Sequence, residues 1–410
     1  MREMKDSGIE WIGEIPKSWK ICRLKDYAHI CNGRDYSEVL DENGEYPVIG
    51  SGGQFENASK ALYSSESVLL GRKGTIDKPI YINQPFWTVD TMYYTEIKEN
   101  TWAKYFYYLC TQIEFDFYQY GSAVPSMTQR DLYNVNFPYP TIEEQQRIAD
   151  YLDRKCSQID TIIARQQEVI EKLKAYKLSV ITEAVTKGLN PDAPMKDSGI
   201  ERIGEIPEHW EIVRLKFLLS QIIDCPHETP VYSIDGEYLV IRTADQECGG
   251  LRSDEDMYRL NESEYRNRIR RMALEKDDIV YGREGERWGL ACLIPESNKY
   301  CLGQRMLQFR CKTNQFLPRF AMWALNSKYI YLQGSVDTIG STSPHVNIST
   351  VRNYFVPIPN ISEQKKIADY IDKKVLGIDR EVAHRETLIK KLTDYKKSLI
   401  YEVVTGKKEV

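Results

Sequence analysis

Two nearly identical blocks of sixteen residues constrain the fold of this chain more than any other feature. Residues 4–19 read MKDSGIEWIGEIPKSW, and residues 195–210 read MKDSGIERIGEIPEHW. A second matched pair follows, with PTIEEQ at residues 140–145 and PNISEQ at residues 359–364. Chance does not produce such matches in the same order twice, so we expect one structural unit to be built two times along the chain.

The two halves differ most between these matched ends. The offset between equivalent residues grows from 191 at Met4 and Met195 to 219 at Thr141 and Asn360, so the second half carries 28 extra residues in its interior. One scaffold is therefore expected to carry two different surfaces. The short marks that both halves keep are GRKG at residues 71–74 against GREG at 282–285, and Gly-Ser pairs at 121–122 and 340–341, each followed by a proline.

A long helix is predicted after each second block. Thr141 with Glu144, and Asn360 with Glu363, have the spacing of a helix cap that follows a proline. In each predicted helix, apolar residues then recur at steps of three and four residues, with a few polar residues among them. This pattern is typical of a coiled-coil seam. We place the seam at Ile148, Leu152, Lys155, Ile159, Ile162, Gln166, Val169, Leu173, Tyr176 and Val180, and at Ile367, Ile371, Lys374, Ile378, Glu381, Arg385, Leu388, Leu392, Tyr395 and Leu399.

The two helices are expected to pack on each other. Roughly 35 to 40 residues at about 1.5 Å each make a rod of some 50 to 60 Å, and neither stripe is stable alone. The chain must run down one helix and return along the other, which predicts an antiparallel pair with the globular domains at its opposite ends, related by a pseudo-twofold axis. The predicted segments are a first domain at 1–140, a first helix at 141–190, a second domain at 191–357 and a second helix at 358–410.

Each globular domain is predicted to be α+β, a mixed α/β structure. Short β-rich runs such as SVLL at residues 67–70 and DIVY at 278–281 are separated by Gly and Asn turns. Helical stretches with aromatic stripes are expected at residues 101–115 and 318–332. Their aromatic side chains are interpreted as core.

Charge and cysteine content limit the classes of function. A net charge of −5 counts against nucleic-acid binding, although affinity for phosphate depends on local patches and not on the average. The nine cysteines show no zinc-ligand spacing and are interpreted as reduced, mostly buried thiols. A charged, Gly- and Pro-containing start and the lack of a long apolar run predict a cytoplasmic protein that does not enter a membrane.

No sequence motif for catalysis is visible. The chain contains no phosphate-binding GxxxxGK[ST] loop, no amino-methyltransferase motif and no GxSxG elbow, and its five histidines form no ligand spacing. We therefore expect a non-catalytic protein with no cofactor and no metal. A nuclease site assembled from distant carboxylates is the remaining enzymatic alternative.

Together, the paired DSGIExIGEIPxxW openings, the GRxG turns, the Gly-Ser-x-x-Pro loops and the EQxxIAxY helices resemble the specificity subunit of type I restriction-modification systems. The resemblance covers essentially the whole chain. It implies two target-recognition domains that read a split sequence in double-stranded DNA with an unread gap. It also implies that the helices dock methyltransferase (M) subunits and, through them, the restriction and translocase (R) subunits.

Candidate DNA contacts follow from the chemistry of base reading, in which Arg or Lys binds guanine and Asn or Gln binds adenine. For each candidate, the alternative is an exposed turn or a solvated charged face. The candidates are Arg72, Lys73, Thr75, Arg283 and Arg287 in turns, Ser122, Gln129, Arg130, Ser341, His345 and Asn347 in polar loops, and the basic run Arg266, Arg268, Arg270 and Arg271. Candidate partner contacts on the helices are Arg147, Tyr151, Arg154, Lys366, Tyr370, Glu381 and Arg385.

A second function from a different class stays open. Sequence divergence confined to the globular domains fits two different DNA half-sites, but it also fits two different protein partners. The alternative is an assembly scaffold that does not bind DNA. Specific duplex binding by the assembled complex distinguishes the two functions.

Overall fold

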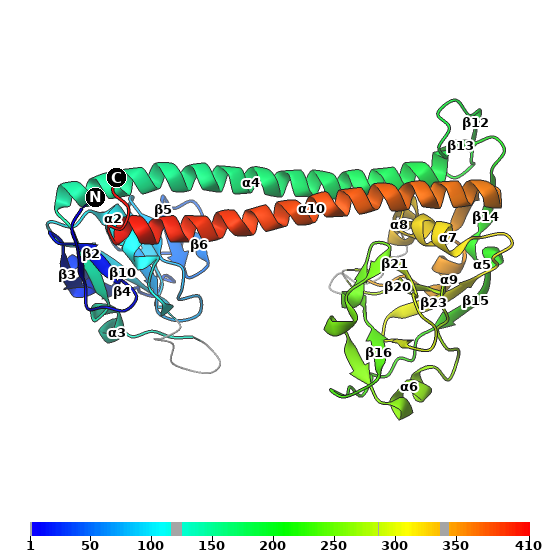
Figure 1. Ribbon diagram of the computed structural model, residues 1–410, viewed down its shortest axis with the longest axis horizontal. Coiled ribbons are helices and arrows are strands. Elements are labelled where there is room, and N and C mark those ends of the chain that lie inside the picture. Colours follow the sequence, from blue (N-terminus) through cyan, green and yellow to red (C-terminus); the bar gives the residue numbers. More distant parts are fainter. Residues whose placement is uncertain (1, 116–124, 286, 337–343) are drawn as a thin grey trace. The chain divides into compact units, whose positions relative to one another are not determined.

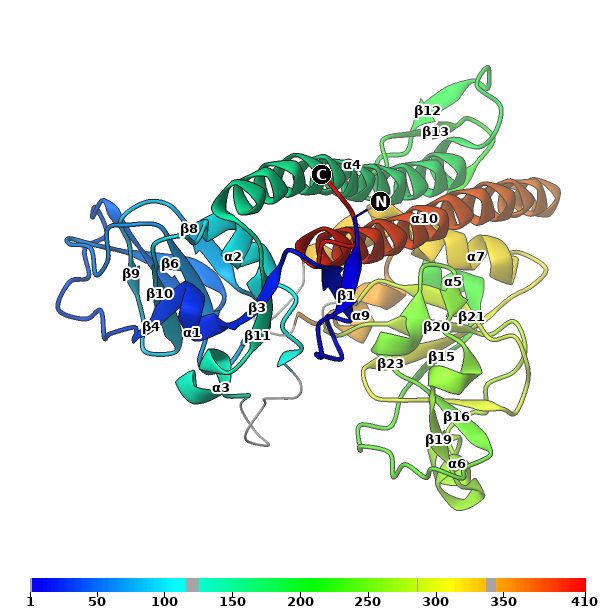
Figure 2. The ribbon, with the colours of Figure 1, turned by 60° about the vertical axis from the view of Figure 1, so that its left-hand side comes forward.

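A computed structural model of the chain describes residues 2–115, 125–285, 287–336 and 344–410. These residues form two compact units, which we call the first unit (Met1–Gln166 with Glu386–Val410) and the second unit (Gln167–Arg385). Each long helix contributes one segment to each unit. In the first unit the two chain termini lie side by side, and Arg2 pairs with Glu409 at 3.1 Å (Figures 1 and 2).

The first unit is built on two small sheets. An antiparallel sheet has the order β4 (Ala28–Asn32), β10 (Met92–Ile97), β7 (Ser67–Gly71) and β8 (Ile80–Ile82). A second sheet has the order β6 (Gly53–Ala58), β5 (Tyr46–Gly50) and β9 (Trp87–Thr88), with β5 and β9 parallel. The other elements are the pair β1 (Met4–Asp6) and β2 (Glu14–Pro16), the pair β3 (Lys20–Arg23) and β11 (Asn136–Tyr139), and the helices α1 (Leu24–Tyr27), α2 (Ala103–Cys110) and α3 (Gln129–Tyr133).

The second unit repeats this topology. Its larger sheet has the order β15 (Leu219–Asp224), β23 (Met306–Cys311), β20 (Ile279–Gly282) and β21 (Ala291–Leu293). Its smaller sheet has the order β19 (Tyr258–Leu260), β16 (Tyr238–Ile241) and β22 (Tyr300–Leu302), again with one parallel pair. The repeat is completed by the pairs β12 (Met195–Asp197) with β13 (Glu205–Pro207) and β14 (Glu211–Arg214) with β24 (Phe355–Ile358), and by the helices α5 (Leu215–Leu218), α7 (Pro318–Leu325) and α9 (Ile348–Arg352). A further helix, α8 (Lys328–Ser335), follows α7.

The extra residues of the second half lie mainly between β16 and β20. GEYPVI at residues 44–49 matches GEYLVI at 236–241 with an offset of 192, whereas Gly71 and Gly282 differ by 211, so 19 of the 28 added residues fall between these points. They accommodate the hairpin of β17 (Gln246–Glu247) and β18 (Gly250–Leu251) and the helix α6 (Glu262–Arg268).

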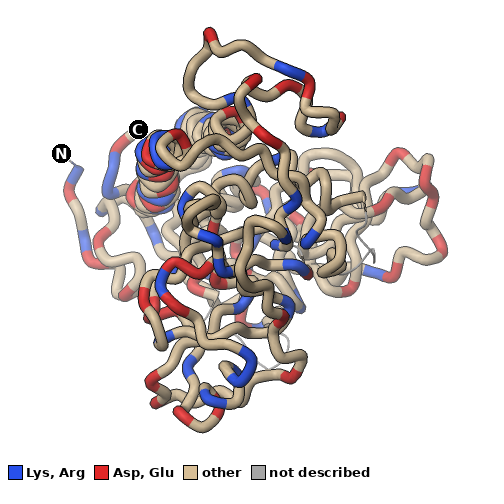
Figure 3. The backbone as a smooth tube through the Cα atoms, turned by 90° about the vertical axis from the view of Figure 1, so that its right-hand side faces the viewer, with Lys and Arg blue, Asp and Glu red and all other residues tan. Residues whose placement is uncertain are grey.

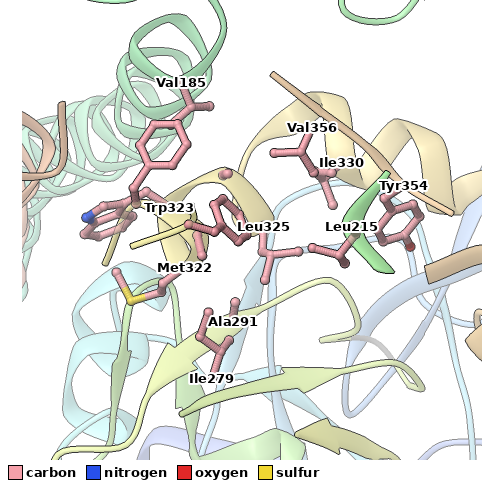
Figure 4. Close-up of a cluster of buried hydrophobic side chains, with 14 of the residues drawn as sticks. Val185, Leu215, Ile279, Ala291, Met322, Trp323, Leu325, Ile330, Tyr354 and Val356 are labelled. Carbon is pink, nitrogen blue, oxygen red and sulfur yellow. The ribbon is translucent and has the colours of Figure 1, made fainter. Parts of the chain in front are cut away.

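The sheets and helices of both units confirm the α+β prediction for the two domains. Each unit also has its own apolar core. In the second unit, Val185 from a long helix lies with Trp323, Leu325 and Ile330 over the sheet residue Ile279 (Figure 4). In the first unit, the ring of Tyr27 stacks on Phe106 with centroids 5.7 Å apart. The helical stretch expected at residues 318–332 is divided into α7 and α8, and between them Asn326 uses its amide to pair with the backbone N–H and carbonyl of Ala291.

The two long helices, α4 (Ile142–Lys187) and α10 (Ile361–Val404), begin as predicted. Thr141 Oγ1 accepts a hydrogen bond from Glu144 N at 3.4 Å, and Asn360 Oδ1 accepts one from Glu363 N at 3.0 Å. Gly188 follows α4 with φ +74°, a conformation that favours glycine and ends the helix. None of the described helices is long and apolar enough to span a membrane.

The helices pack antiparallel within each unit, as predicted. In the first unit, Lys396 Nζ lies 2.7 Å from a carboxylate oxygen of Asp160. In the second unit, Lys177 Nζ lies 2.8 Å from a carboxylate oxygen of Asp379. These are equivalent pairs of the repeat, because both lysines and both aspartates are separated by the offset of 219 that also relates the helix caps.

Five of the twenty predicted seam positions were wrong, because their side chains are exposed. Lys155, Ile162, Tyr176, Lys374 and Tyr395 are exposed. Alternating steps of three and four residues fit a seam in either order. In the structure the step of four residues comes first along the buried stripe, and the step of three residues follows it. Buried or half-buried side chains also occur one position later, at Cys156, Ile163, Ile170 and Lys177 on α4, and at Val375, Val382, Ile389 and Lys396 on α10.

Candidate nucleic-acid interface

In the first unit, the GRKG turn at the end of β7 is held against the segment that precedes α3. Gly74 N donates to Pro125 O at 3.0 Å, and Met127 N donates to Arg72 O at 3.0 Å. A β-bridge joins Lys73 to Ser126. The turn therefore forms one small backbone platform with residues 125–127.

The second unit builds the same platform from the GREG turn. Gly285 N donates to Pro344 O at 2.9 Å, Val346 N donates to Arg283 O at 2.9 Å, and a β-bridge joins Glu284 to His345. We call residues 71–74 with 125–127 the first paired turn, and residues 282–285 with 344–346 the second paired turn. The GRxG turn and the proline that follows each Gly-Ser pair are thus brought together in each unit.

The arginines of the paired turns have mainly a structural role. Arg72 donates through Nη1 to Asp90 O at 3.2 Å, and its guanidinium lies 5.9 Å from the centre of the Tyr93 ring. Burial raises the pKa of Tyr93, while Arg72 opposes the rise. Arg283 is only 7% exposed, and its ion-pair partners are Glu284 at 2.9 Å and Asp224 at 3.5 Å. The geometry therefore argues against Arg283 as a direct contact to a base.

The other candidates of the first unit lie around its paired turn. Lys73 is exposed and Thr75 is half-buried. Gln129 donates to Asn32 Oδ1 at 3.3 Å, and Arg130 is exposed on α3. Ser122 lies outside the described residues.

In the second unit, His345 is half-buried and Asn347 is exposed at the start of α9. Arg287 is exposed, but its Nη1 donates to the backbone carbonyls of Ala244 and Gln246 at 3.3 and 3.2 Å, which joins the turn to the inserted hairpin. Ser341 lies outside the described residues. Gln129, Arg130 and Asn347 thus border their paired turns, whereas Arg287 has a supporting position.

The basic run of the second unit is not one continuous cationic surface. Arg268 is 4% exposed and donates to the backbone carbonyls of residues 226, 228 and 302, so its expected phosphate contact is not compatible with its burial. Arg266 pairs with Glu262 at 2.6 Å, and Arg270 lies 4.0 Å from Glu228. Arg271 donates to Asp224 O at 2.8 Å. Arg266, Arg270 and Arg271 are exposed and can still reach phosphate.

Two residues beside the paired turns were missed at the sequence level. Thr91 O accepts from the backbone N–H of Arg72 at 2.9 Å, and Arg305 O accepts from the backbone N–H of Arg283 at 3.1 Å. Arg305 has φ +67°, which is uncommon for a residue with a side chain, and its side chain is 53% exposed. Its sequence context, QRM against DTM in the first half, contains no motif that could have identified it.

The candidate partner contacts on the helices are charged or aromatic. In the first unit, Arg147 and Arg154 are exposed and Tyr151 is half-buried. In the second unit, Lys366 is exposed and Tyr370 is 38% exposed. Glu381 and Arg385 form an ion pair of 2.6 Å within α10, beside the seam position Val382. Basic and acidic positions are interspersed along the long helices (Figure 3).

One group of possible metal ligands occurs among the described residues. Ligand atoms of His29, Cys31 and Glu96 lie within 4.8 Å of one another on β4 and β10. His29 Nδ1 lies 3.0 Å from the hydroxyl of Tyr133. Burial raises the pKa of the Cys31 thiol, which disfavours the thiolate that a metal would need. The group gives no reason to add a metal to the interface.

Comparison with known proteins identifies relatives over the whole length. The family described as type I restriction modification DNA specificity domain matches residues 16–172 and 226–390. The type I restriction enzyme MjaVIII specificity subunit of Methanocaldococcus jannaschii is 24% identical over 96% of this chain and 93% of its own length. The EcoBI specificity subunit of Escherichia coli is 23% identical over 91% of this chain and 85% of its own.

A solved structure shares the fold. It comes from a study of complex assembly and conformational transition in the type I R-M system and superposes with a TM-score of 0.68 at 15% sequence identity. The alignment covers 95% of this chain and 98% of that chain. The fold of this chain is therefore already known in another protein.

Proposed function

The chain belongs to the family of type I restriction-modification DNA specificity domains, and from this membership we propose that it binds a split target in double-stranded DNA for partner subunits. In this proposal, methyltransferase (M) subunits dock on the long helices, and restriction and translocase (R) subunits join through them. The chain itself supplies DNA sequence specificity, and the chemistry belongs to the other subunits. We place this complex in the cytoplasm, where it meets chromosomal DNA.

The observation that carries the proposal is the second paired turn, which repeats the backbone of the first with different side chains. Shared glycines and prolines keep the platform, while Lys73 and Ser126 are replaced by Glu284 and His345. Two protein surfaces that share a framework but differ in hydrogen-bonding groups are suited to two DNA half-sites of different sequence. We retain residues 1–140 and 191–357 as the proposed target-recognition domains, with 141–190 and 358–410 as the spacer helices.

The acidic net charge is compatible with this function because base reading depends on a local surface. Exposed cations lie near the paired turns in both units, among them Lys73 and Arg130 in the first and Arg305 in the second. Methyltransferase subunits that enclose the duplex would add further phosphate contacts. The complex, and not this chain alone, is expected to show the full affinity.

The scaffold function is not favoured. The family match covers most of both repeats and includes the divergent regions as well as the helices. The relatives that match 96% and 91% of the chain are named as specificity subunits. A pure scaffold would need the same framework for an unrelated purpose in each unit.

A methylation map tests the proposal. The chain is expressed with its M subunits in a host that lacks other adenine and cytosine methyltransferases, and modified bases are mapped across the genome. We expect one split motif, with two specified parts separated by a gap of fixed length. A host that expresses the M subunits without the chain is the control.

Identical maps from both hosts would contradict the proposal, provided that the chain and the M subunits co-purify. In that case the chain assembles the complex without directing it, which is the behaviour of the scaffold. A continuous motif without a gap would retain DNA specificity but contradict the two-domain reading of a split target.

A further inference from the structure

We propose that two side-chain positions of each paired turn, with one position beside it, determine which bases that domain reads. In the first domain they are Lys73, Thr91 and Ser126, and in the second they are Glu284, Arg305 and His345. This inference rests on the proposed function and assigns specificity to named residues. Within the second set, Arg305 is assigned to a guanine of the half-site.

The three positions are structurally equivalent in the two units. Thr91 and Arg305 each accept the backbone N–H of the turn arginine through their own carbonyl, at 2.9 and 3.1 Å. The two other positions face each other across the same β-bridge, Lys73 with Ser126 and Glu284 with His345. The three positions therefore have the same place in the backbone hydrogen-bonding pattern of both platforms, although only Arg305, and not Thr91, has a positive φ.

The residues around these positions are shared, whereas the positions themselves differ. Both turns keep the sequence Gly-Arg-x-Gly, and both opposing segments begin with proline. The first set offers an ammonium group and two hydroxyls, and the second offers a carboxylate, a guanidinium and an imidazole. The shared residues thus set the backbone, and the variable residues set the pattern of donors and acceptors.

Arg305 is oriented by a chain of ion pairs. Arg283 is buried and lies 2.9 Å from Glu284 Oε1, while Glu284 Oε2 lies 3.7 Å from Arg305 Nε. Arg283 also lies 3.5 Å from Asp224, at the end of β15. Glu284 thus also positions Arg305, because it lies between the buried Arg283 and one edge of the Arg305 guanidinium.

The backbone at Arg305 supports a functional role. A side-chain-bearing residue with φ +67° is held in a conformation that costs about 1 kcal/mol or more, and such residues cluster at functional sites. A guanidinium that is half exposed and fixed at one edge matches the bidentate contact of arginine with guanine.

The test replaces Arg305 in the complex of the chain with its M subunits. Arg305→Gly removes the side chain and fits the positive φ, so the variant is expected to fold. Methylation maps and binding competition with duplexes that carry single base changes are measured for both proteins. We expect Arg305→Gly to lose discrimination at one guanine position of one half-site by roughly 10- to 100-fold, with the other half-site unchanged.

Two further variants make the result specific. Arg305→Lys keeps the charge but lacks the planar fork, so we expect it to bind DNA better than Arg305→Gly and to recover only part of the discrimination. Asn298→Gly is the matched control, because Asn298 is an exposed residue of the same domain with φ +59° outside the paired turn. Its map and its affinity are expected to equal those of the parent protein.

A uniform loss of affinity in Arg305→Gly, with unchanged discrimination and full recovery by lysine, would overturn the assignment in favour of a phosphate contact. An unchanged map and affinity would also overturn it. Both results presuppose a split motif in the parent complex, so they contradict only the assignment. A parent complex that methylates no split motif would instead contradict the proposed function.

Discussion

Single buried side chains join the matched sequence blocks of each repeat. The indole N–H of Trp19 donates to Glu144 at 3.1 Å, and that of Trp210 donates to Glu363 at 3.2 Å. The tryptophan comes from the first matched block of its repeat and the glutamate from the second. Because this bond fixes the start of a long helix to the opening hairpin, it explains why both blocks keep these residues.

The neighbouring glutamines have the same role. Gln364 is fully buried, accepts from Leu317 N at 2.9 Å and donates to the carbonyls of Gln315 and Pro359 at 2.8 and 2.9 Å. Gln145 makes the equivalent three bonds in the first unit. The glutamine of the EQ motif therefore satisfies backbone groups that would otherwise be buried without partners.

We predict that Gln364→Ala destabilises the protein by about 2 to 3 kcal/mol, because it leaves one backbone N–H and two carbonyls without this partner. Urea denaturation followed by circular dichroism measures the change. The exposed neighbour Lys365 provides the control, and Lys365→Ala is expected to change the free energy of unfolding by less than about 0.5 kcal/mol. Equal effects of the two substitutions would contradict the structural role of Gln364.

Because several thiols are buried, we predict that the folded protein loses stability at alkaline pH. Burial raises the pKa of Cys292, Cys301 and Cys311 to about 12 each, from an ordinary value of 9.0. Above pH 9 the unfolded chain loses thiol protons that the folded chain retains, so the unfolded state is favoured as the pH rises. The stability from these thiols is complete below pH 9 and is lost progressively toward pH 12.

The measurement is the free energy of unfolding between pH 8 and pH 10 under reducing conditions. Each thiol contributes a slope of up to about 1.4 kcal/mol per pH unit above pH 9. Replacing all three cysteines with alanine should lower stability at pH 8 and should make the decline above pH 9 shallower. Parallel pH profiles for the parent and the triple variant would show that the thiols do not cause the decline.

At the scale of elements, the long helices combine an apolar stripe with charged seam positions. Lys177 and Lys396 occupy seam positions on α4 and α10, and each reaches an aspartate on the partner helix within its unit. A lysine in a seam is tolerated when its stem packs on apolar neighbours and its ammonium group finds a carboxylate. These pairs fix the register of the antiparallel helices more specifically than the apolar residues do.

A double-mutant cycle on Lys177 and Asp379 should give a coupling energy of about 0.5 to 1 kcal/mol, because the side chain of Lys177 is only 15% exposed. The pair Lys172 and Glu168 is the control, since its side chains are 73% and 63% exposed within one helix. Its coupling is expected to be about 0.3 kcal/mol. If the coupling energy of Lys177 and Asp379 is no larger than that of the control pair, the proposal that this ion pair fixes the helix register is contradicted.

At the scale of the whole molecule, the chain forms its units from segments that are distant in sequence. The first unit needs residues 386–410 as well as the first 166 residues, and Tyr105 donates a hydrogen bond to the carbonyl of Val404. The pseudo-twofold relation of the domains, and their separation by the helices, stay predictions of the repeat. They imply that the helices act as a ruler, so that the length of the helices sets the length of the unread gap in the DNA target.

We predict that removing one heptad from each helix, residues 165–171 and 385–391, shortens the gap in the methylated motif by roughly three base pairs. Seven residues correspond to about 10 Å of helix, and a base pair to about 3.4 Å. Both deletions lie between the ion-paired positions of their helix, so each pair can still form. Deletion in α4 alone is the control and should impair assembly, whereas an unchanged gap in the double deletion would refute the ruler.

Sequence alone determined the repeat, the long helices and the α+β class of the domains, because these depend on local patterns and on identity between segments. The helix caps at Thr141 and Asn360 were predictable for the same reason, since a cap is made by residues three positions apart. The family resemblance added the function, which the comparisons support.

Tertiary structure alone decided which residues of those patterns face inward. Arg268 and Arg283 belong to conspicuous basic motifs, but backbone carbonyls of distant segments surround Arg268, and Arg283 is paired with Asp224 as well as with its neighbour Glu284. Arg305 has no motif and becomes a candidate only because the chain brings it beside the turn at residues 282–285. Burial and ion pairing depend on contacts between residues that are far apart in sequence. The local spacing of residues therefore does not predict them.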